Sequence, residues 1–217
     1  MARVRVRQHV NPLSHKYQVR RTPPNWEEIY AQPAQPLHLD IGCARGRFLL
    51  KMAQLEPDWN FLGLEIREPL VEEGNEGRDR ADLQNLHYFF CNVNIDLDLL
   101  LESLPSGVLQ AVTIQFPDPW FKKRHEKRRT VQPELVNTLA RYAIAGGKIF
   151  LQSDVEAVAR QMHRCFSTHP DFCQVHLEPW LETNPLPVPT EREIATLGRN
   201  GTVYRSLFVK SRRSLDK

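Results

Sequence analysis

The chain has 217 residues, of which 41% are hydrophobic and 25% are charged, and its formal net charge is +3. This balance is ordinary for one globular domain that can bury a core, and the short apolar runs predict no transmembrane helix. The four cysteines lie far apart without a CxxC pair, and the eight histidines lack metal-ligand spacing. We therefore expect no disulfide framework, no metal and a cytoplasmic location.

The predicted elements alternate between strands and helices. Residues 1–36 are basic and then rich in proline, and we interpret them as an N-terminal arm that is not a domain of its own. Residues 37–217 form the predicted main domain, with strands at 37–41, 59–65, 86–91, 108–116 and 148–153, helices at 45–55, 69–81, 96–104, 131–143 and 155–167, and two final strands at 173–178 and 202–209. This alternation predicts an α/β fold with a doubly wound, mostly parallel sheet, in which the last two strands pair antiparallel.

The basic residues are concentrated in three segments, 1–21, 122–129 and 199–217. Together these segments hold 18 of the 29 Lys and Arg residues but only 2 of the 26 Asp and Glu residues. The rest of the chain therefore carries a net charge of −13. An acidic body with three basic segments indicates a polyanionic partner, and we favour nucleic acid over the alternative that the basic tails are merely solvated.

A glycine-containing loop joins the first predicted strand to the first predicted helix. It reads DIGCARG and runs from Asp40 through Gly42 to Gly46. Glycines allow the backbone to turn sharply and a ligand to approach it closely, and ligands of open α/β sheets bind beyond the carboxyl ends of the strands. The spacing is not GxGxxG, and an ordinary strand–helix turn would also explain it.

Polar side chains also end the next two predicted strands. Glu65, at the end of the second strand, can accept hydrogen bonds from the ribose of a nucleoside-containing cofactor. Asn92 follows the third strand and offers the donor and acceptor that match an adenine edge, and Asn94 is a rival for that role. Taken singly, Glu65 also fits a solvated acid, and either asparagine also fits a turn residue.

The most specific segment follows the fourth predicted strand and reads PDPWFKKRHEKRR over residues 117–129. Asp118 lies between two prolines, which hold the backbone stiff and extended around its carboxylate. Trp120 and Phe121 offer flat faces to a base, and the cationic run can neutralise phosphates. A rigid acid beside aromatic and cationic side chains is typical of a nucleotide-handling site.

The sequence resembles the bacterial tRNA (guanine-N7-)-methyltransferase family over nearly its whole length, from DIGCARG through GLE, PDPWFKKRHEKRR and QSD to TEREIATLGRNGTVYR. The PDPW-x-KKRH-x-KRR segment is the specific part, because the glycine loop alone indicates only the wider methyltransferase fold. The resemblance implies a Rossmann-like class I methyltransferase sheet with an antiparallel C-terminal strand. It also implies S-adenosylmethionine as cofactor and N7 of a guanine in the variable loop of tRNA as the methylated atom.

The resemblance further implies roles for the residues that match the family's motifs. Asp118 would be the catalytic acid. The cofactor-binding residues would be Asp40, Gly42, Gly46, Glu65 and Asn92. The substrate-binding residues would be Lys122, Asp154, Thr190 and Glu193, and the RNA-contacting residues would be Lys123, Arg124, Lys127, Arg128 and Arg129.

Some of these positions depart from the family's pattern or fit a second interpretation. Ala44 stands where a middle glycine is common, Asn92 replaces the commoner Asp, and Phe121 stands where proline or another residue is usual. Only the affinity for the cofactor is affected by these departures. Asp154 also fits a helix N-cap, and the motif over residues 190–193 also fits a helix capping box.

Three other functions compete with tRNA methylation. A methyltransferase for a protein or a small molecule would not need three basic segments. A nucleic-acid-binding module with an inactive cofactor site would lack Asp40, Glu65 and Asp118, which are all present. A nicotinamide-dependent dehydrogenase is disfavoured because GxGxxG is absent. The sequence leaves both a monomer and a homodimer open.

Overall fold

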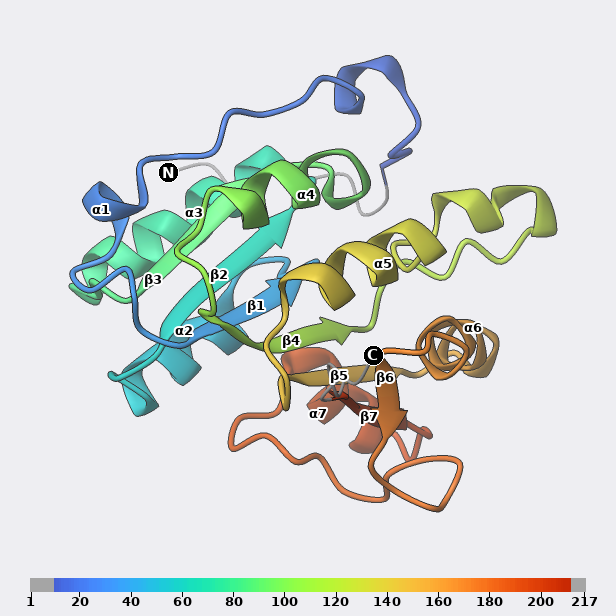
Figure 1. Ribbon diagram of the computed structural model, residues 1–217. Coiled ribbons are helices and arrows are strands. Elements are labelled where there is room, and N and C mark those ends of the chain that lie inside the picture. The colour runs from blue at the N-terminus through green and yellow to red at the C-terminus, as the bar shows by residue number, and fades with distance from the viewer. Residues whose placement is uncertain (1–9, 212–217) are drawn as a thin grey trace, which may run out of the picture.

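The computed structural model describes residues 10–211 and contains one seven-stranded sheet (Figure 1). The strands lie in the order β3-β2-β1-β4-β5-β7-β6. Their bounds are β1 Leu37–Ile41, β2 Asn60–Glu65, β3 Leu86–Phe90, β4 Leu109–Gln115, β5 Lys148–Ser153, β6 Phe172–Gln174 and β7 Tyr204–Lys210. The first five strands pair in parallel, and β7 pairs antiparallel with both β5 and β6. The predicted α/β class and its antiparallel end are therefore confirmed.

Helices cover both faces of the sheet. Their bounds are α1 Trp26–Ile29, α2 Arg47–Leu55, α3 Glu68–Arg80, α4 Val93–Glu102, α5 Pro133–Tyr142, α6 Glu156–Ser167 and α7 Glu191–Leu197, with 3-10 turns η1 His15–Tyr17 and η2 Lys123–Arg128. Helices α4, α5 and α6 pack beside one another on one face, whereas α2 and α3 pack together against β2 and β3 (Figure 1). Within the described part of the chain, no helix is both long and apolar enough to cross a membrane.

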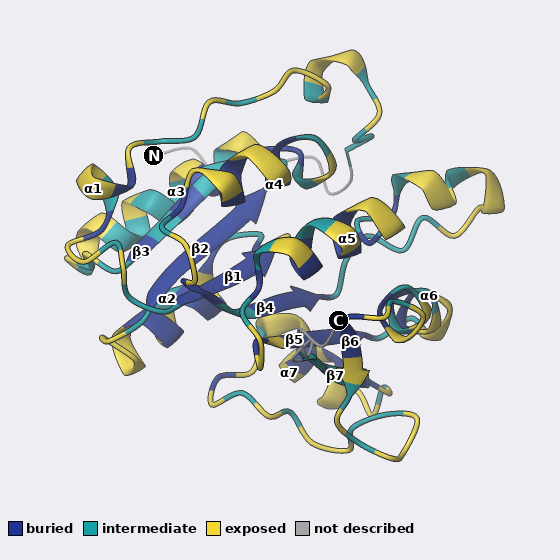
Figure 2. Ribbon diagram, viewed as in Figure 1, coloured by how far each residue is buried: buried dark blue, intermediate teal, exposed yellow. Residues whose placement is uncertain are grey.

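The core consists of two apolar clusters, one on each face of the sheet. The strands between them are mostly buried (Figure 2). The larger cluster joins the buried sides of α4, α5 and α6 to the strands. The smaller one gathers Phe48, Leu49 and Met52 of α2 around Tyr88 of β3. The α2 residues share one helical face, as their spacing predicts, because residues three or four apart in a helix lie on the same side. Each helix keeps an exposed outer side, as Figure 2 shows.

The N-terminal segment lies over the end of the sheet formed by β2 and β3 and the neighbouring α4 (Figure 1). Trp26 is buried in the larger cluster, where its indole nitrogen donates to the Ser103 hydroxyl at 2.8 Å. Tyr30 is buried beside it and donates to the carbonyl of Phe61 at 3.0 Å. Trp26 and Tyr30 therefore belong to the core, whereas Glu27 and Glu28 between them are exposed.

The structure differs from the sequence-based elements mainly near the end of the chain. The predicted strand 173–178 is wrong in length, since β6 ends at Gln174. The Gln174 side chain donates to the carbonyls of His176 and Glu178, at 2.9 and 3.0 Å, and turns the chain out of the sheet. Helix α7, which the sequence offered only as a capping-box alternative, starts at Glu191.

Candidate active site

One pocket lies at the carboxyl ends of β1, β2, β3 and β4, where the strand order reverses between β1 and β4. Ligands of open α/β sheets bind at such a switch point. The pocket is lined by residues that follow each of these strands, among them Gly42, Glu65, Arg67, Asn92 and Asp118. The structure therefore brings together five of the predicted site residues, Gly42, Glu65, Asn92, Asp118 and Arg128, which lie up to 86 positions apart in the sequence.

The glycine loop meets this pocket through Gly42. Gly42 has a φ of 83°, and no atom lies within 4 Å of the position that a β-carbon would occupy, so its backbone is open to a ligand. Gly46 packs closely against β3, because a β-carbon there would lie 2.2 Å from the Tyr88 ring, and its contact with the cofactor stays a prediction. Ala44 has a φ of 50°, a left-handed conformation that glycine adopts more readily.

Asp40 lies beneath the pocket. Its carboxylate accepts hydrogen bonds from the Thr113 hydroxyl at 2.6 Å and from the Gln115 amide at 3.4 Å. Burial raises the pKa of Asp40 to about 6, the two hydrogen bonds oppose this rise, and the charge of Glu65 adds to it. Asp40 is 4% exposed and is not among the residues that line the pocket, so its contact with the cofactor stays a prediction.

Glu65 is 3% exposed, and its carboxylate is fully hydrogen-bonded. It accepts from the backbone N–H groups of Ala44 and Arg67, both at 3.0 Å. It also accepts from the Arg67 guanidinium through Nε and Nη2, both at 2.9 Å. A carboxylate has about four lone-pair sites, so a ribose hydroxyl that binds Glu65 takes over a contact now made by Arg67. Sequence reasoning missed Arg67, although its position two residues after Glu65 could have indicated it.

Asn92 joins the N-terminal segment to the pocket. Its amide nitrogen donates to the carbonyls of Pro12 and Tyr17 at 3.0 and 2.9 Å, and its amide oxygen caps α4 by accepting from Asn94 N–H at 3.3 Å. The neighbouring Asp96 carboxylate accepts from the backbone N–H of Arg21 at 2.9 Å. Residues 10–21 thus pass beside the pocket, and adenine contact by Asn92 or Asn94 stays a prediction.

The acid between the two prolines lies at the pocket with a tightly turned backbone on either side. Phe116 and Trp120 have φ values of 50° and 42°, which are uncommon for residues with side chains and cluster at functional sites. The Phe116 N–H still donates to the carbonyl of Gln152 at 2.8 Å, so the segment leaves the sheet directly before Asp118. This geometry fixes the backbone of Asp118 beside the pocket.

The cationic segment forms η2 beside Asp118. Arg128 lines the pocket and lies over the Trp120 ring at 5.0 Å from the ring centre. Arg129 is 8% exposed and donates to the carbonyl of Pro119 at 3.1 Å, so its first role is to hold the loop, and a contact with RNA stays a prediction. The exposed cations on η2 and at its start are Lys122, Lys123, Arg124 and Lys127, and Glu126 is exposed among them. The basic residues before position 10 and after position 211 lie outside the described residues.

The remaining predicted substrate residues gather around the start of α7. The Asp154 carboxylate pairs with Arg192, whose Nε lies 2.9 Å away, and does not cap α6. The Thr190 hydroxyl accepts from Glu193 N–H at 3.2 Å, so the capping interpretation is confirmed for this half of the motif. The Glu193 side chain turns inward and pairs with Arg205 at 2.7 Å.

The donor set of the pocket fits S-adenosylmethionine. An open glycine backbone follows β1, a carboxylate that can accept from a ribose ends β2, and an amide follows β3. Among residues 10–211, no group of three or more His, Cys, Asp or Glu side chains is arranged to hold a metal ion. The sheet order and this site define a class I S-adenosylmethionine-dependent methyltransferase.

The comparisons with known proteins agree with this class. Residues 34–206 match the family model described as a putative methyltransferase, and the chain belongs to this family. A tRNA (guanine-N(7)-)-methyltransferase of Microcystis aeruginosa is 61% identical, covering 96% of this chain and 99% of that protein. An enzyme of the same name from Trichormus variabilis is 62% identical, covering 94% and 95% of the two chains.

Solved structures support the fold alone. A precorrin-6y C5,15-methyltransferase from Geobacter metallireducens superposes with a TM-score of 0.53 at 13% identity, covering 85% of both chains. An rRNA methylase from Streptococcus thermophilus gives a TM-score of 0.52 at 10% identity, covering 82% of this chain and 89% of that one. These likenesses extend to the sheet and its helices and not to the substrate.

Proposed function

We propose that this protein transfers the methyl group of S-adenosylmethionine to N7 of a guanine in the variable loop of tRNA. The observation that carries the proposal is the pocket in which Gly42, Glu65 and Asp118 meet, with the cationic η2 segment directly beside it. The names of the relatives support the same substrate. Because the substrate is tRNA, the proposal includes a cytoplasmic location, as a monomer or a homodimer.

The proposed chemistry needs little proton transfer. S-adenosylmethionine supplies, when bound, a methyl group on a positively charged sulfur. Guanine N7 carries a lone pair that is not protonated at neutral pH, so no base has to remove a proton before attack. Transfer of this methyl group to N7 would break the carbon–sulfur bond and would move the positive charge from the sulfur to the guanine ring. The protein therefore contributes mostly orientation and charge stabilisation.

Asp118 is the residue that we assign to stabilisation of that charge. Its carboxylate lies at the pocket on a backbone that two prolines and two left-handed residues hold in one conformation. A fixed carboxylate opposes a growing positive charge without reorganising, which is the main advantage of such sites over water. Asp154 and Glu193 are further proposed contacts of the guanine.

The cationic segment and the stacked Arg128–Trp120 pair are assigned to the RNA. Lys122, Lys123, Arg124 and Lys127 are exposed and can neutralise phosphates. Trp120 can stack on a base, and Arg128 already covers one side of its ring. Both features support a single-stranded or looped region of RNA as the substrate, since bases in a helix are not accessible to stacking.

The test is methyl transfer from labelled cofactor to an unmodified tRNA transcript, followed by digestion and identification of the methylated nucleoside and its position. A transcript with 7-deazaguanine at the variable-loop position lacks the attacking nitrogen and is the matched control. We expect 7-methylguanosine at one position and no incorporation into the control. Equal incorporation into both transcripts, or a methyl group on another atom, would contradict the proposal.

A binding assay separates this function from the dehydrogenase alternative. We expect S-adenosylhomocysteine to raise the thermal unfolding midpoint of the protein, because a ligand that binds only the folded state stabilises it. NAD should leave the midpoint unchanged. Stabilisation by NAD alone would refute the assignment of the pocket.

A further inference from the structure

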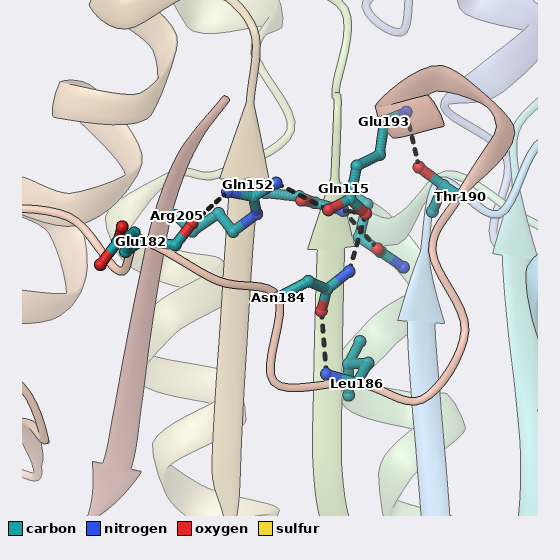
Figure 3. A network of polar contacts seen from close by, with 8 residues as sticks. All are labelled: Gln115, Gln152, Glu182, Asn184, Leu186, Thr190, Glu193 and Arg205. Atoms are coloured by element: carbon teal, nitrogen blue, oxygen red, sulfur yellow. Dashed lines mark hydrogen bonds and ion pairs between the residues drawn. The ribbon is translucent and has the colours of Figure 1, made fainter. Parts of the chain in front are cut away.

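A chain of buried hydrogen bonds runs across the carboxyl ends of the strands from Asp40 to α7. Figure 3 shows its part from Gln115 through Gln152 to Glu193. The chain starts at Asp40 of β1, which accepts from the Gln115 amide of β4 at 3.4 Å. The Gln115 amide oxygen accepts from Gln152 Nε2 of β5 at 2.8 Å. The same Gln152 nitrogen also donates to Glu193 Oε2 of α7 at 3.2 Å. Three hydrogen bonds thus join the two carboxylates Asp40 and Glu193.

The two glutamines occupy positions where apolar residues would be expected. They are direct neighbours in the β4–β5 register, and their neighbours along the strands, such as Ile114 and Leu151, are buried apolar residues. Gln152 is 0% exposed, and its amide oxygen has no hydrogen-bond partner within the described structure. Burial of an amide is unfavourable unless its hydrogen bonds are made, so this pair does not serve packing alone.

Glu193 is the end of these hydrogen bonds on α7, and the proposed function places the guanine beside it. Its Oε2 also accepts from the Asn184 amide at 2.7 Å, and its Oε1 accepts from Arg205 at 2.7 Å. The carboxylate therefore holds β5, β7 and the loop before α7 together, as Figure 3 shows. A change in the orientation of this carboxylate must be shared by all three elements.

We propose that Gln115 and Gln152 are positioning residues that couple occupancy of the cofactor site at Asp40 to the orientation of Glu193 on the guanine side. This inference rests on the proposed function, which assigns Asp40 to the cofactor and Glu193 to the guanine. Each amide in the chain can satisfy its partner in only one orientation, because its oxygen accepts and its nitrogen donates. A ligand that displaces the Asp40 carboxylate therefore shifts the Gln115 amide that donates to it, and with it the Gln152 amide and the Glu193 carboxylate.

The contact between Gln115 and Asp40 is the longest of the three and is the link that we expect the cofactor to change. At 3.4 Å it is weaker than the 2.8 Å contact between the glutamines. Cofactor binding that shortens this contact would favour one arrangement of the chain. By linkage, tRNA binding at Glu193 would then strengthen cofactor binding by the same factor.

The experiment measures the dissociation constant of unmodified tRNA without and with saturating S-adenosylhomocysteine. The two constants give a coupling ratio for the wild type and for Gln115→Leu, Gln152→Leu and the double variant. We expect the cofactor product to tighten tRNA binding by at least about fivefold in the wild type. Each single variant should reduce the ratio to below about twofold. The coupling ratio of the double variant should equal that of the single variants, because loss of one glutamine already interrupts the series of hydrogen bonds.

Gln110→Leu is the matched control, because it makes the same change on the same strand at a residue outside these hydrogen bonds. It should keep the wild-type coupling ratio. Thermal unfolding of each variant separates loss of coupling from loss of folding. If a leucine variant does not fold, Gln115→Asn carries the test, because it shortens the side chain and keeps an amide. A wild-type ratio near one, or a ratio unchanged in folded variants, overturns the proposal. Absence of binding by S-adenosylhomocysteine or of methyl transfer would instead refute the proposed function.

Discussion

Asp40, a buried acid in β1, should make the free energy of unfolding depend on pH, and the substitution Asp40→Asn should remove this dependence. Asp40 has an ordinary pKa of 3.8, and in the folded protein burial raises this pKa to about 6. A carboxyl group whose pKa is raised by folding stabilises the folded state fully below its unfolded pKa. That stabilisation is lost as the pH rises through the folded pKa. The window for Asp40 therefore runs from about pH 4 to pH 6.

The size of the effect follows from the shift. A rise of about two pKa units corresponds to about 3 kcal/mol, at 1.36 kcal/mol for each unit. Asp40→Asn cannot ionise, so it is spared this loss. We expect the unfolding free energy of the variant, relative to wild type, to increase by about 3 kcal/mol across the window. The hydrogen bond from Thr113 at 2.6 Å can be kept, because the amide oxygen of asparagine can accept it.

Urea unfolding followed by circular dichroism at a series of pH values between about 4 and about 7.5 measures this difference. Asp58→Asn, which removes an exposed acid, is the matched control. Parallel curves for wild type and Asp40→Asn over the whole range would show that the Asp40 carboxyl titrates normally, and the account of its burial would then be wrong.

Three further substitutions test the ion pair, the acid and the cationic segment. Arg205→Met should destabilise the protein by about 3–5 kcal/mol in urea unfolding, because it leaves the buried Glu193 carboxylate without its cation, and adding Glu193→Gln should restore most of the loss. A cost below about 1 kcal/mol for the single change would contradict a buried pair. Asp118→Ala should lower kcat by at least about tenfold while the dissociation constant for tRNA stays unchanged; an unaltered kcat at saturating substrates would remove Asp118 from the chemistry. Lys122→Ala should weaken tRNA binding and reduce the slope of log affinity against log salt by about one, whereas Lys148→Ala, at the other end of the sheet, should do neither.

Several features of the fold could be predicted from local sequence. The boundaries of β1 and β5 agree with the predicted ranges, since each is a short run of strand-forming residues flanked by turn signals. The meeting of Gly42, Glu65 and Asp118 at one pocket also follows from local signals. Each ends or follows a parallel strand, and the carboxyl ends of parallel strands lie on the same edge of a sheet.

Other features could not be predicted because they depend on partners far away in the sequence. The Asn92 amide is 80 residues from Pro12, whose carbonyl it binds, and no local pattern relates the two. The sequence predicts that Arg129 contacts RNA like the other cations of the basic segment. In the structure Arg129 is buried and donates to the carbonyl of Pro119. β6 is short because the Gln174 side chain binds the following turn, which a strand-like sequence does not reveal.

The sequence by itself determined the order of strands and helices, the rigid acid after the fourth strand and the cationic segment beside it. These depend on residue spacing, proline geometry and local charge, which act over a few residues. Only the tertiary structure decided which charged groups pair, such as Arg67 with Glu65 and Arg205 with Glu193, and that two glutamines link Asp40 to α7. The physical reason is that an ion pair or a buried hydrogen bond forms between whichever groups packing brings within about 3 Å, and packing is a property of the whole chain.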